Sequence, residues 1–282
     1  MATPPFAIEQ PLPVTQNAPT DVIVFKNVSI AFEEKLVLEE ISFRLAKGET
    51  KAIFGVAGSG KSTLLKLALG LMKPDSGHIY VLGDDVTQMS ENALFELRRR
   101  IGIVFQESAL FDSLTVRENV AFRLLEEASA SEDEIEKRVR EALSFVELEH
   151  TVDKFPSELS GGMRRRVAIA RAIITQPEIL LYDSPTGGLD PVTSTTIIEL
   201  IVKQRDVYKT SSLLVTHRLQ DAFTMASHYF NREKNRMEPL APKSKTEVPL
   251  SFLILRDGKI IFDGDVQELA QSKDEYIREY IA

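Results

Sequence analysis

The sequence predicts an α/β fold in which a parallel sheet is interrupted by a helical subdomain. Short apolar runs typical of buried strands alternate with helix-forming segments, and this alternation is the pattern of a parallel core. A charge-rich, helix-forming stretch over residues 91–149 separates the first buried strand from the later ones, so the core is split. Buried strands are expected at residues 51–54, 179–182 and 212–215, and an antiparallel β pair at residues 21–30 and 41–45.

The overall composition excludes several classes of protein. The chain has 282 residues, of which 43% are hydrophobic, and this is enough to bury the core of one large domain or two modest ones. The formal net charge is −8, so the surface as a whole gives no electrostatic footing for nucleic acid, and no nucleic acid is expected as a partner. The chain has no cysteine, which removes disulfides, thiolate metal sites and thiol catalysis.

Changes in composition along the chain predict its domain organisation. Residues 1–20 are rich in proline and lack the basic start and apolar stretch of a signal peptide, so we expect a flexible lead-in. No run of about 18 apolar residues occurs, so contact with a membrane is expected only through partners. The other expected boundaries are 21–270 for the main domain, about 107–170 for its inserted helical subdomain, about 228–250 for a polar insert and 271–282 for a C-terminal helical tail.

Local signals predict the individual elements of these segments. Apolar residues recur at helical spacing over residues 61–71, which predicts a helix directly after the first buried strand. Ser131 resembles a capped helix start within the helical subdomain. The polar, proline-marked residues 228–249 are expected to form a loop. Residues 251–255 and 259–262 flank an Asp-Gly turn and predict a hairpin, after which a short charged helix ends the chain.

A phosphate-binding loop joins the first buried strand to the helix that follows. Residues 55–62 read Gly-Val-Ala-Gly-Ser-Gly-Lys-Ser, which is the eight-residue pattern of such loops in the required strand and helix context. Its glycines allow backbone N–H groups to turn towards phosphate, and the helix dipole adds positive charge. The alternative is a glycine-rich helix start that binds nothing. The expected nucleotide-binding residues are Gly55, Gly58, Ser59, Gly60, Lys61, Ser62 and Thr63.

The expected ligands of this loop are ATP and Mg²⁺. Lys61 is expected to bridge the β- and γ-phosphates, Ser62 to ligate Mg²⁺ and Thr63 to donate to a phosphate. Asp183 follows a predicted buried strand, so its carboxylate reaches the sheet edge where nucleotide sites of open α/β sheets lie. An isolated aspartate after a strand is usually a helix cap, but beside a phosphate loop Asp183 is expected to be a water-mediated partner of Mg²⁺.

Further motifs resemble the ATP-binding-cassette family over about residues 22–269. Residues 159–163 read Leu-Ser-Gly-Gly-Met and are similar to the family's signature, which lies between the phosphate loop and Asp183. The resemblance implies that Phe32 stacks on adenine, that Gln106 is the Q-loop glutamine and a metal ligand, and that His217 is the switch histidine. Taken singly, these residues could be a core aromatic, a surface polar residue and a strand-end cap.

The resemblance also implies a head-to-tail ATP sandwich made of two copies of the chain. The signature opens a helix, so its hydroxyl and its backbone N–H groups could face a γ-phosphate, and in the family they face the partner's nucleotide. Residues 188–190 resemble the family's D-loop. The residues expected to act in trans are Ser160, Gly161, Gly162 and Asp190.

Residues 105–116, 119–122 and 162–167 resemble the lipid-transport branch of the family. The implied partners are an MlaE-type permease, docking near the Q-loop and the helical subdomain, and a lipid-binding MCE-domain protein. The implied location is peripheral, on the cytoplasmic face of the inner membrane. Two runs of three arginines, at residues 98–100 and 164–166, are expected to form solvated faces and local ion pairs, because neighbours on a helix point about 100° apart.

Ser184 departs from the family pattern. The family has Glu-Pro-Thr after the magnesium aspartate, whereas residues 184–186 read Ser-Pro-Thr. A serine hydroxyl has no anionic state near neutral pH, and losing a general base typically costs about 10² to 10⁴ in rate. The expected catalytic residues are therefore His217, Gln106 and Ser184 at the position of the usual glutamate. Natural divergence with slow turnover is favoured over an engineered trapped variant or a binding-only switch, because a trapping change is usually glutamate to glutamine.

Three functions remain open from the sequence. An ATPase subunit that energises membrane transport, with impaired or slow hydrolysis, is favoured because the chain holds one cassette and no fused soluble effector domain. A soluble cassette protein of translation or DNA maintenance would predict two cassettes or long coiled coils. An ATP-binding regulatory subunit without turnover is suggested by Ser184 alone.

Overall fold

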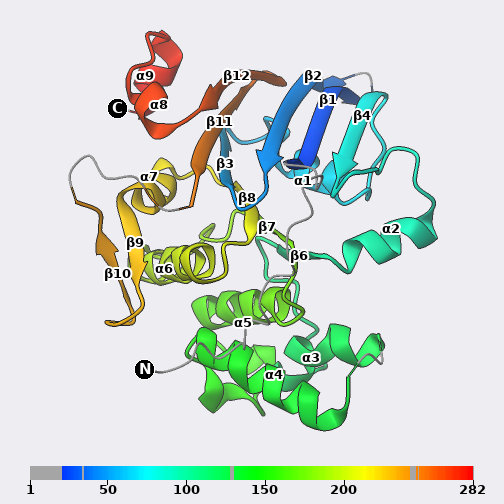
Figure 1. Ribbon diagram of the computed structural model, residues 1–282, viewed down its shortest axis with the longest axis vertical. Coiled ribbons are helices and arrows are strands. Elements are labelled where there is room, and N and C mark those ends of the chain that lie inside the picture. The colour runs from blue at the N-terminus through cyan, green and yellow to red at the C-terminus, as the bar shows by residue number, and fades with distance from the viewer. Residues whose placement is uncertain (1–20, 34, 128–129, 242–245, 247, 282) are drawn as a thin grey trace, which may run out of the picture.

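A six-stranded sheet in the order β12-β11-β3-β8-β7-β6 forms the centre of the fold (Figure 1). The computed structural model describes residues 21–33, 35–127, 130–241, 246 and 248–281, and the lead-in expected at residues 1–20 lies outside the described residues. The strands from β11 to β6 are parallel, and β12 is antiparallel to β11, which confirms the predicted parallel core and the predicted C-terminal hairpin. The strands are β3 (Thr50–Gly55), β6 (Ile101–Val104), β7 (Ile179–Asp183), β8 (Ser211–Val215), β11 (Leu250–Arg256) and β12 (Lys259–Gly264).

Both faces of this sheet are buried, which explains the continuous apolar runs of its strands. Successive side chains alternate between two hydrophobic clusters: Phe54 and Tyr182 belong to one cluster, whereas Ile53 and Leu181 belong to the other. The first cluster joins the sheet to most of the helices. The second joins it to the antiparallel β subdomain and to the helix after the phosphate loop.

The antiparallel subdomain has four strands in the order β2-β1-β4-β5. They are β1 (Asp21–Phe32), β2 (Lys35–Ala46), β4 (Ser76–Val81) and β5 (Asp84–Asp85). The pairing of β1 with β2 confirms the antiparallel piece predicted at the start of the chain. Helix α1 (Lys61–Ala68) packs in the same hydrophobic cluster as these strands, through Leu64, Leu65 and Leu67.

Helices α3 (Val116–Glu126), α4 (Glu132–Phe145) and α5 (Gly161–Ile173) lie together below the sheet in Figure 1, and we call them the helical lobe. The predicted cap of α4 is present, because Ser131 Oγ accepts the N–H of Glu134 at 3.3 Å. A reciprocal capping box of Thr115 and Glu118 begins α3.

The remaining helices are α2 (Glu91–Arg98), α6 (Pro191–Tyr208), α7 (Leu219–Ser227), α8 (Val266–Ala270) and α9 (Glu275–Ile281), with short 3-10 helices at Glu149–Thr151 and Pro156–Glu158. Helices α6 and α7 lie beside the central sheet and α8 and α9 at its end, whereas α2 lies beyond the edge formed by β6 (Figure 1). Across the described ranges, none of the helices combines the length and the apolar character needed to cross a membrane.

Two predicted elements differ in extent from the structure. The charge-rich stretch 91–149 is not helical throughout, because Ile101 and Val104 are buried and their segment forms β6, paired with β7. The strand has only four residues, too few for its alternation to stand out from the helical pattern around it. The helix expected at residues 61–71 ends at Ala68, because Gly70 adopts the left-handed φ of 61° that closes the last turn.

The segment expected to be a loop at residues 228–249 instead begins with a hairpin. Strands β9 (His228–Asn231) and β10 (Arg236–Pro239) pair antiparallel beside α6. The prediction was wrong for residues 228–239, because most side chains of the hairpin are polar and only Phe230 and Met237 reach the first hydrophobic cluster. Part of the remaining predicted loop, residues 242–245 and 247, lies outside the described residues. Glu238 forms ion pairs with Lys234 and Arg236, which hold the pKa of its carboxyl down to about 2.

Candidate functional site

The phosphate loop connects β3 to α1 at the carboxyl edge of the central sheet. Gly58 and Gly60 have φ values of 78° and 93°, in the left-handed region that favours glycine. A methyl group on Gly55 would lie 2.5 Å from the carbonyl oxygen of Leu255, so only glycine lets the loop pass this close to β11. The backbone conformation therefore explains the glycines independently of any ligand.

Lys61 lies inside the loop, with only 8% of its surface exposed. Its Nζ donates to the carbonyl oxygens of Gly55 at 2.8 Å and Val56 at 2.7 Å, and to Ser59 Oγ at 3.3 Å. Burial lowers the pKa of this ammonium group, and the negative charge of Asp183 opposes that shift. Three neutral oxygens are weak partners for a buried cation, so the arrangement favours an anionic ligand at this ammonium group.

Ser62 and Asp183 meet across the end of the sheet. The hydroxyl of Ser62 donates to Asp183 Oδ1 at 3.0 Å, although the two residues are 121 positions apart. Mg²⁺ prefers oxygen ligands in an octahedron with bonds of about 2.0 to 2.1 Å, which sets neighbouring ligand oxygens about 3 Å apart. The donor set and spacing of these two residues therefore fit Mg²⁺.

Ser184 lies in a tight turn directly after β7. Its φ is 47°, its surface is 7% exposed, and its N–H donates to the carbonyl oxygen of Val215 at 2.8 Å. Gly187 N–H donates to the carbonyl oxygen of Ser184 at 2.9 Å and closes the turn. The backbone of Ser184 is therefore held firmly at the edge where Asp183 meets Ser62.

A buried carboxyl group connects this turn to the segment that carries His217. Asp221 Oδ2 accepts hydrogen bonds from the hydroxyls of Thr186 and Thr216. Burial raises the pKa of Asp221, against the opposing effects of these hydrogen bonds and of the nearby Arg218 and His217. The His217 side chain itself is exposed, and the structure places it directly after Thr216 at the end of β8.

Gln106 lies in the turn after β6, and its side chain is exposed. A methyl group on Gly187 would lie 3.4 Å from Gln106 Cγ, so the glutamine packs beside the turn that carries Ser184. Phe32, at the end of β1, is 40% exposed and does not belong to the core. The alternative interpretation of Phe32 as a core aromatic is therefore wrong, and its ring is available for stacking. Thr63 lies half-buried in the first turn of α1.

The signature residues lie on a different face of the sheet from Lys61. Ser160 caps α5, since its Oγ accepts the N–H of Met163 at 3.2 Å. Gly162 lies against α6, where a methyl group would be 2.3 Å from Thr193 Cγ2, and Gly161 faces Leu189. Helix α5 packs in the first hydrophobic cluster and α1 in the second, so one chain does not assemble the phosphate loop and the signature into one site.

Asp190, which was expected to act in trans, is engaged within its own chain. Its Oδ1 accepts the N–H groups of Val192 and Thr193, both at 3.0 Å, and caps α6. The hydroxyl of Thr193 donates to Oδ2 at 2.5 Å, and these bonds lower the pKa of Asp190. Its direct role in this conformation is to begin the helix after the D-loop.

The two runs of arginines are only in part as expected. Arg99 and Arg100 form ion pairs at the surface with Glu96 and Glu178. Arg165, however, is only 4% exposed, and its guanidinium donates to the carbonyl oxygens of Phe105 and Gly187. The expectation of a solvated face is wrong for Arg165, because its neighbours one turn further on, Ala168 and Ile169, lie in the core. That helical spacing in the sequence was the signal that could have identified it.

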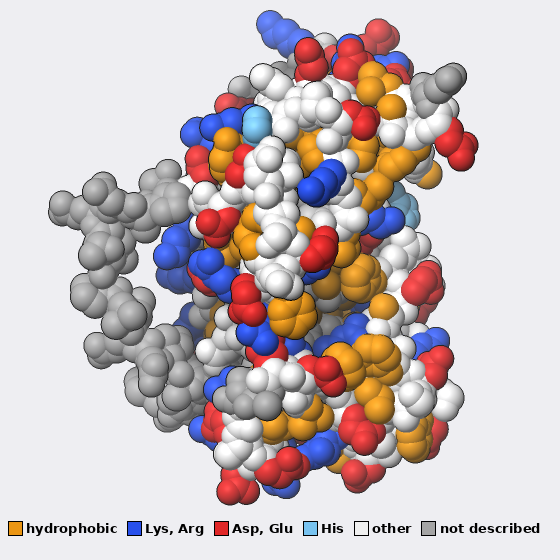
Figure 2. Space-filling view, turned by 90° about the vertical axis from the view of Figure 1, so that its right-hand side faces the viewer, with side chains coloured by type: hydrophobic (Ala, Val, Ile, Leu, Met, Phe, Trp, Pro, Cys, Tyr) orange, Lys and Arg blue, Asp and Glu red, His pale blue; other side chains and the backbone are white. Residues whose placement is uncertain are grey.

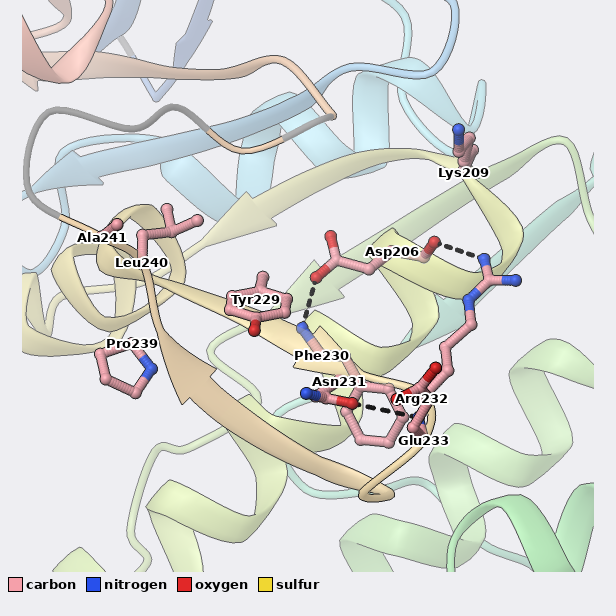
Figure 3. Close-up of a pocket in the computed structure, with 10 residues that line it drawn as sticks. All are labelled: Asp206, Lys209, Tyr229, Phe230, Asn231, Arg232, Glu233, Pro239, Leu240 and Ala241. Atoms are coloured by element: carbon pink, nitrogen blue, oxygen red, sulfur yellow. Dashed lines mark hydrogen bonds between the residues drawn. The ribbon is translucent and has the colours of Figure 1, made fainter.

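A separate pocket of about 910 Å³ lies between α6 and the hairpin of β9 and β10 (Figure 3). Its polar groups are used by the hairpin: Asp206 accepts the N–H of Phe230 at 2.8 Å, and Arg232 donates to the carbonyl oxygen of Asp206 at 2.9 Å. Asn231 Oδ1 accepts the N–H of Glu233 at 3.1 Å. These contacts explain the pocket as part of the hairpin's attachment to α6, and none of its lining residues belongs to the phosphate loop.

Comparison with known proteins gives one consistent family. A family model described as ABC transporter matches residues 38–187. The chain is 37% identical over 271 residues to Protein TRIGALACTOSYLDIACYLGLYCEROL 3, chloroplastic, of Arabidopsis thaliana, covering 93% of this chain and 74% of that protein. It is 32% identical over 254 residues to the intermembrane phospholipid transport system ATP-binding protein MlaF of Haemophilus influenzae, covering 90% of this chain and 88% of MlaF.

Among solved structures, the chain is similar to the ATP-binding cassette MJ0796, described as a dimer in a post-hydrolysis state bound to ADP and Pi. The TM-score is 0.72 at 30% sequence identity, covering 86% of this chain and 98% of MJ0796.

Proposed function

We propose that this chain, which belongs to the ATP-binding-cassette (ABC) transporter family and binds ATP with Mg²⁺, energises the transport of phospholipid between membranes. The observation that carries the substrate class is the extent of the match to MlaF. The alignment covers 90% of this chain and 88% of MlaF, so it includes the helical lobe as well as the ATPase core. The Arabidopsis relative, matched over 93% of this chain, also has a lipid in its name.

Within one chain, the residues around the phosphate loop would divide the work of holding Mg-ATP. Lys61 would exchange its loop carbonyls for the β- and γ-phosphates, because a phosphate is a stronger partner for a buried ammonium. Ser62 and Asp183 would hold Mg²⁺, which neutralises charge on the phosphates when it is bound. Phe32 would stack on adenine from its exposed position at the end of β1.

The second wall of the site would come from a second copy of the chain. Ser160, Gly161 and Gly162 begin α5, and the N-terminus of a helix favours anions. They lie on the face of the sheet opposite to α1, so a γ-phosphate held by Lys61 could meet them only in another copy. ATP would then stabilise the closed pair, because it makes contacts to both copies in that state alone.

An MlaE-type permease would dock on the segment after Gln106 and on the helical lobe. Large apolar side chains are exposed there: Phe111 and Leu125 are each 43% exposed, and the rings of Phe111 and Phe122 lie tilted against each other with their centroids 4.5 Å apart. On the face of the molecule shown in Figure 2, apolar side chains lie in several small groups between charged ones. A peripheral position on the cytoplasmic face of the inner membrane follows from this docking, with an MCE-domain protein receiving or delivering the lipid.

Hydrolysis would be slow, because Ser184 occupies the position of the general base. Its hydroxyl cannot accept the proton of the attacking water as a carboxylate does, whereas Lys61, Ser62 and Asp183 retain their roles in binding. Gln106 and His217 would remain to orient the water and the γ-phosphate. An ATP-binding subunit that closes without turnover is the second candidate, and it rests on Ser184.

The function is tested by reconstitution. The chain is coexpressed with the MlaE-type permease and the MCE-domain protein of the same genome, and the complex is placed in vesicles that contain a fluorescent phospholipid. We expect transfer to acceptor vesicles that requires Mg-ATP and is lost in Lys61→Met. Recovery of the chain with ribosomes or DNA would contradict the proposal. Phospholipid transfer at the same rate with and without ATP would also contradict it.

A further inference from the structure

Arg165 connects three segments of the nucleotide site through one buried side chain. It lies on α5, four residues after Gly161. Its Nη1 donates to the carbonyl oxygen of Phe105 at 2.9 Å, and its Nη2 to the carbonyl oxygen of Gly187 at 3.3 Å. Phe105 directly precedes Gln106, and Gly187 closes the turn of Ser184. We propose that Arg165 is a positioning residue that sets the turn after β6 against the turn after β7.

The burial of Arg165 is costly, which argues against a role in packing alone. Only 4% of its surface is exposed, and burial lowers the pKa of its guanidinium, opposed by the charges of Glu107 and Asp183. Within the described ranges, no carboxylate lies at ion-pair distance from it and its Nε has no hydrogen-bond partner. An apolar side chain of similar size would fill the space without this desolvation penalty. The hydrogen bonds from the guanidinium to the carbonyl oxygens of Phe105 and Gly187 offset this penalty.

A second arginine of the same helix holds the far end of the turn after β6. Arg171 donates to the carbonyl oxygens of Ala109 at 2.7 Å and Ser108 at 2.8 Å. Ser108 and Ala109 have left-handed φ values of 63° and 48°, so these contacts stabilise an unfavourable backbone conformation. Helix α5 thus forms hydrogen bonds with both ends of residues 105–109. Through Arg165 it also bonds to the turn after β7.

The consequence is a mechanical link from the signature to two turns. Ser160 begins α5, so a displacement of the helix when the signature meets a nucleotide would move both carbonyls that Arg165 holds. Gln106 packs beside Gly187, and the two hydrogen bonds of Arg165 keep the turns after β6 and β7 at a fixed position relative to each other. This inference rests on the proposed function for what the two turns do to ATP, but not for the link itself.

The test compares Arg165→Met with wild type by amide hydrogen exchange of the nucleotide-free full chain. The N–H of Ser108 bonds to the carbonyl oxygen of Phe105, and that of Gly187 bonds to the carbonyl oxygen of Ser184, so both report on the turns. We expect exchange about tenfold faster or more in both turns, since hydrogen bonds to charged groups are worth a factor of ten or more. Arg165→Lys, which reaches one carbonyl at a time, should be intermediate.

Arg166→Met is the matched control. Arg166 lies on the same helix, donates to the carbonyl oxygen of Val146 at 3.1 Å, and has a pKa lowered by burial. It should leave both turns unchanged, and its melting temperature should lie within about 4 °C of that of Arg165→Met. Unchanged exchange in Arg165→Met, or faster exchange spread evenly over the sheet with a lower melting temperature than the control, would overturn the proposal.

A second readout follows the consequence for closure. Arg165→Met should bind a fluorescent ATP analogue within about twofold of wild type, because Lys61 and Ser62 are untouched, but should require more Mg-ATP to form dimers in sedimentation. Normal dimer formation would overturn the link to closure. If amide exchange in the two turns is faster in Arg165→Met, but neither wild type nor Arg165→Met transfers phospholipid, the proposed transport function fails and the positioning role of Arg165 stands.

Discussion

The backbone of Ser184 is held in place by two hydrogen bonds, whereas its hydroxyl cannot act as a general base. The N–H of Ser184 bonds to Val215 and its carbonyl oxygen accepts from Gly187, so the φ of 47° is held from both sides. Any side chain at this position starts from the same place beside Asp183. The chemistry of the position therefore depends on which side chain it carries.

Restoring the carboxylate should raise hydrolysis. In Ser184→Glu, assembled with the permease, we expect phosphate release to increase by about 10² to 10⁴, the typical contribution of general-base catalysis. Ser184→Ala should release phosphate at the wild-type rate, because the hydroxyl is not acting as a base. Equal rates for Ser184→Glu and wild type would show that the missing carboxylate does not limit the reaction.

The buried carboxyl group of Asp221 should make stability depend on pH. Burial raises its pKa above the ordinary value of 3.8, so the folded chain keeps a proton that the unfolded chain has released. The contribution of protonated Asp221 to the free energy of unfolding is therefore fully present below the pKa of the unfolded chain. It is lost as the pH rises through the higher pKa of the folded chain.

Urea unfolding of wild type and Asp221→Asn from about pH 4 to 8 measures this dependence. The variant keeps an acceptor for Thr186 and Thr216 but cannot titrate. We expect the stability of wild type relative to the variant to fall as pH rises. A difference that stays constant across this range would show that Asp221 titrates normally.

At this scale the sequence predicts single residues better than their partners. The glycines, Lys61 and Ser62 form one continuous pattern, and its position between a strand and a helix predicted the loop. Arg165 bonds to two carbonyl oxygens, and Asp221 to the hydroxyl of Thr186, that are more than 20 residues away, and no local pattern encodes such pairs. Only the apolar neighbours of Arg165 indicated its burial.

Among the elements, the loop between β6 and α3 depends on one buried amide. Asn119 is fully buried; its Oδ1 accepts the N–H of Phe111 at 2.8 Å, and its Nδ2 donates to the carbonyl oxygens of Phe111, Leu114 and Thr115, each at 3.0 Å. This loop carries the exposed Phe111 proposed to meet the permease. The surface offered to the partner is therefore shaped from within the helical lobe.

Asn119→Ala should lower the free energy of unfolding by about 2 kcal/mol, because the part-buried N–H of Phe111 and carbonyl oxygen of Leu114 lose the partner that Asn119 supplies. Arg140→Ala, which breaks an exposed ion pair with Glu136, should cost less than about 0.5 kcal/mol. Chemical denaturation of both variants provides the comparison. Similar, small losses would mean that the loop holds its shape without Asn119.

The elements that the sequence predicted well are those with a repeated signal. Buried strands such as β7 and β8 contain short apolar runs, at residues 179–182 and 213–215, and α4 has both a cap and a helical period. Strand β6 is too short for a period, and the hairpin of β9 and β10 is stabilised by charged side chains that usually indicate a loop. Tertiary pairing decided both cases.

For the whole molecule, the separation of the phosphate loop from the signature predicts that Mg-ATP drives pairing. Sedimentation with Mg-ATP should show a species of twice 31.6 kDa, and slow hydrolysis at Ser184 should make it long-lived without further substitution. Lys61→Met, which cannot hold the γ-phosphate, should remain a monomer. A wild-type monomer at saturating Mg-ATP would contradict the shared site.

The place of β3 in the sheet also bears on how the chain matures during synthesis. This strand ends in the phosphate loop, yet both of its neighbours come later in the chain: β8 pairs at Ser212 and β11 at Leu250, and Gly55 is opposite Leu255. At about 5 to 20 residues per second, a ribosome needs about 10 to 40 s to add the residues between Gly55 and Leu255. Until then the loop lacks the strands that fix it. A nascent chain therefore cannot close around ATP before Leu255 has emerged, and premature pairing of unfinished subunits is avoided.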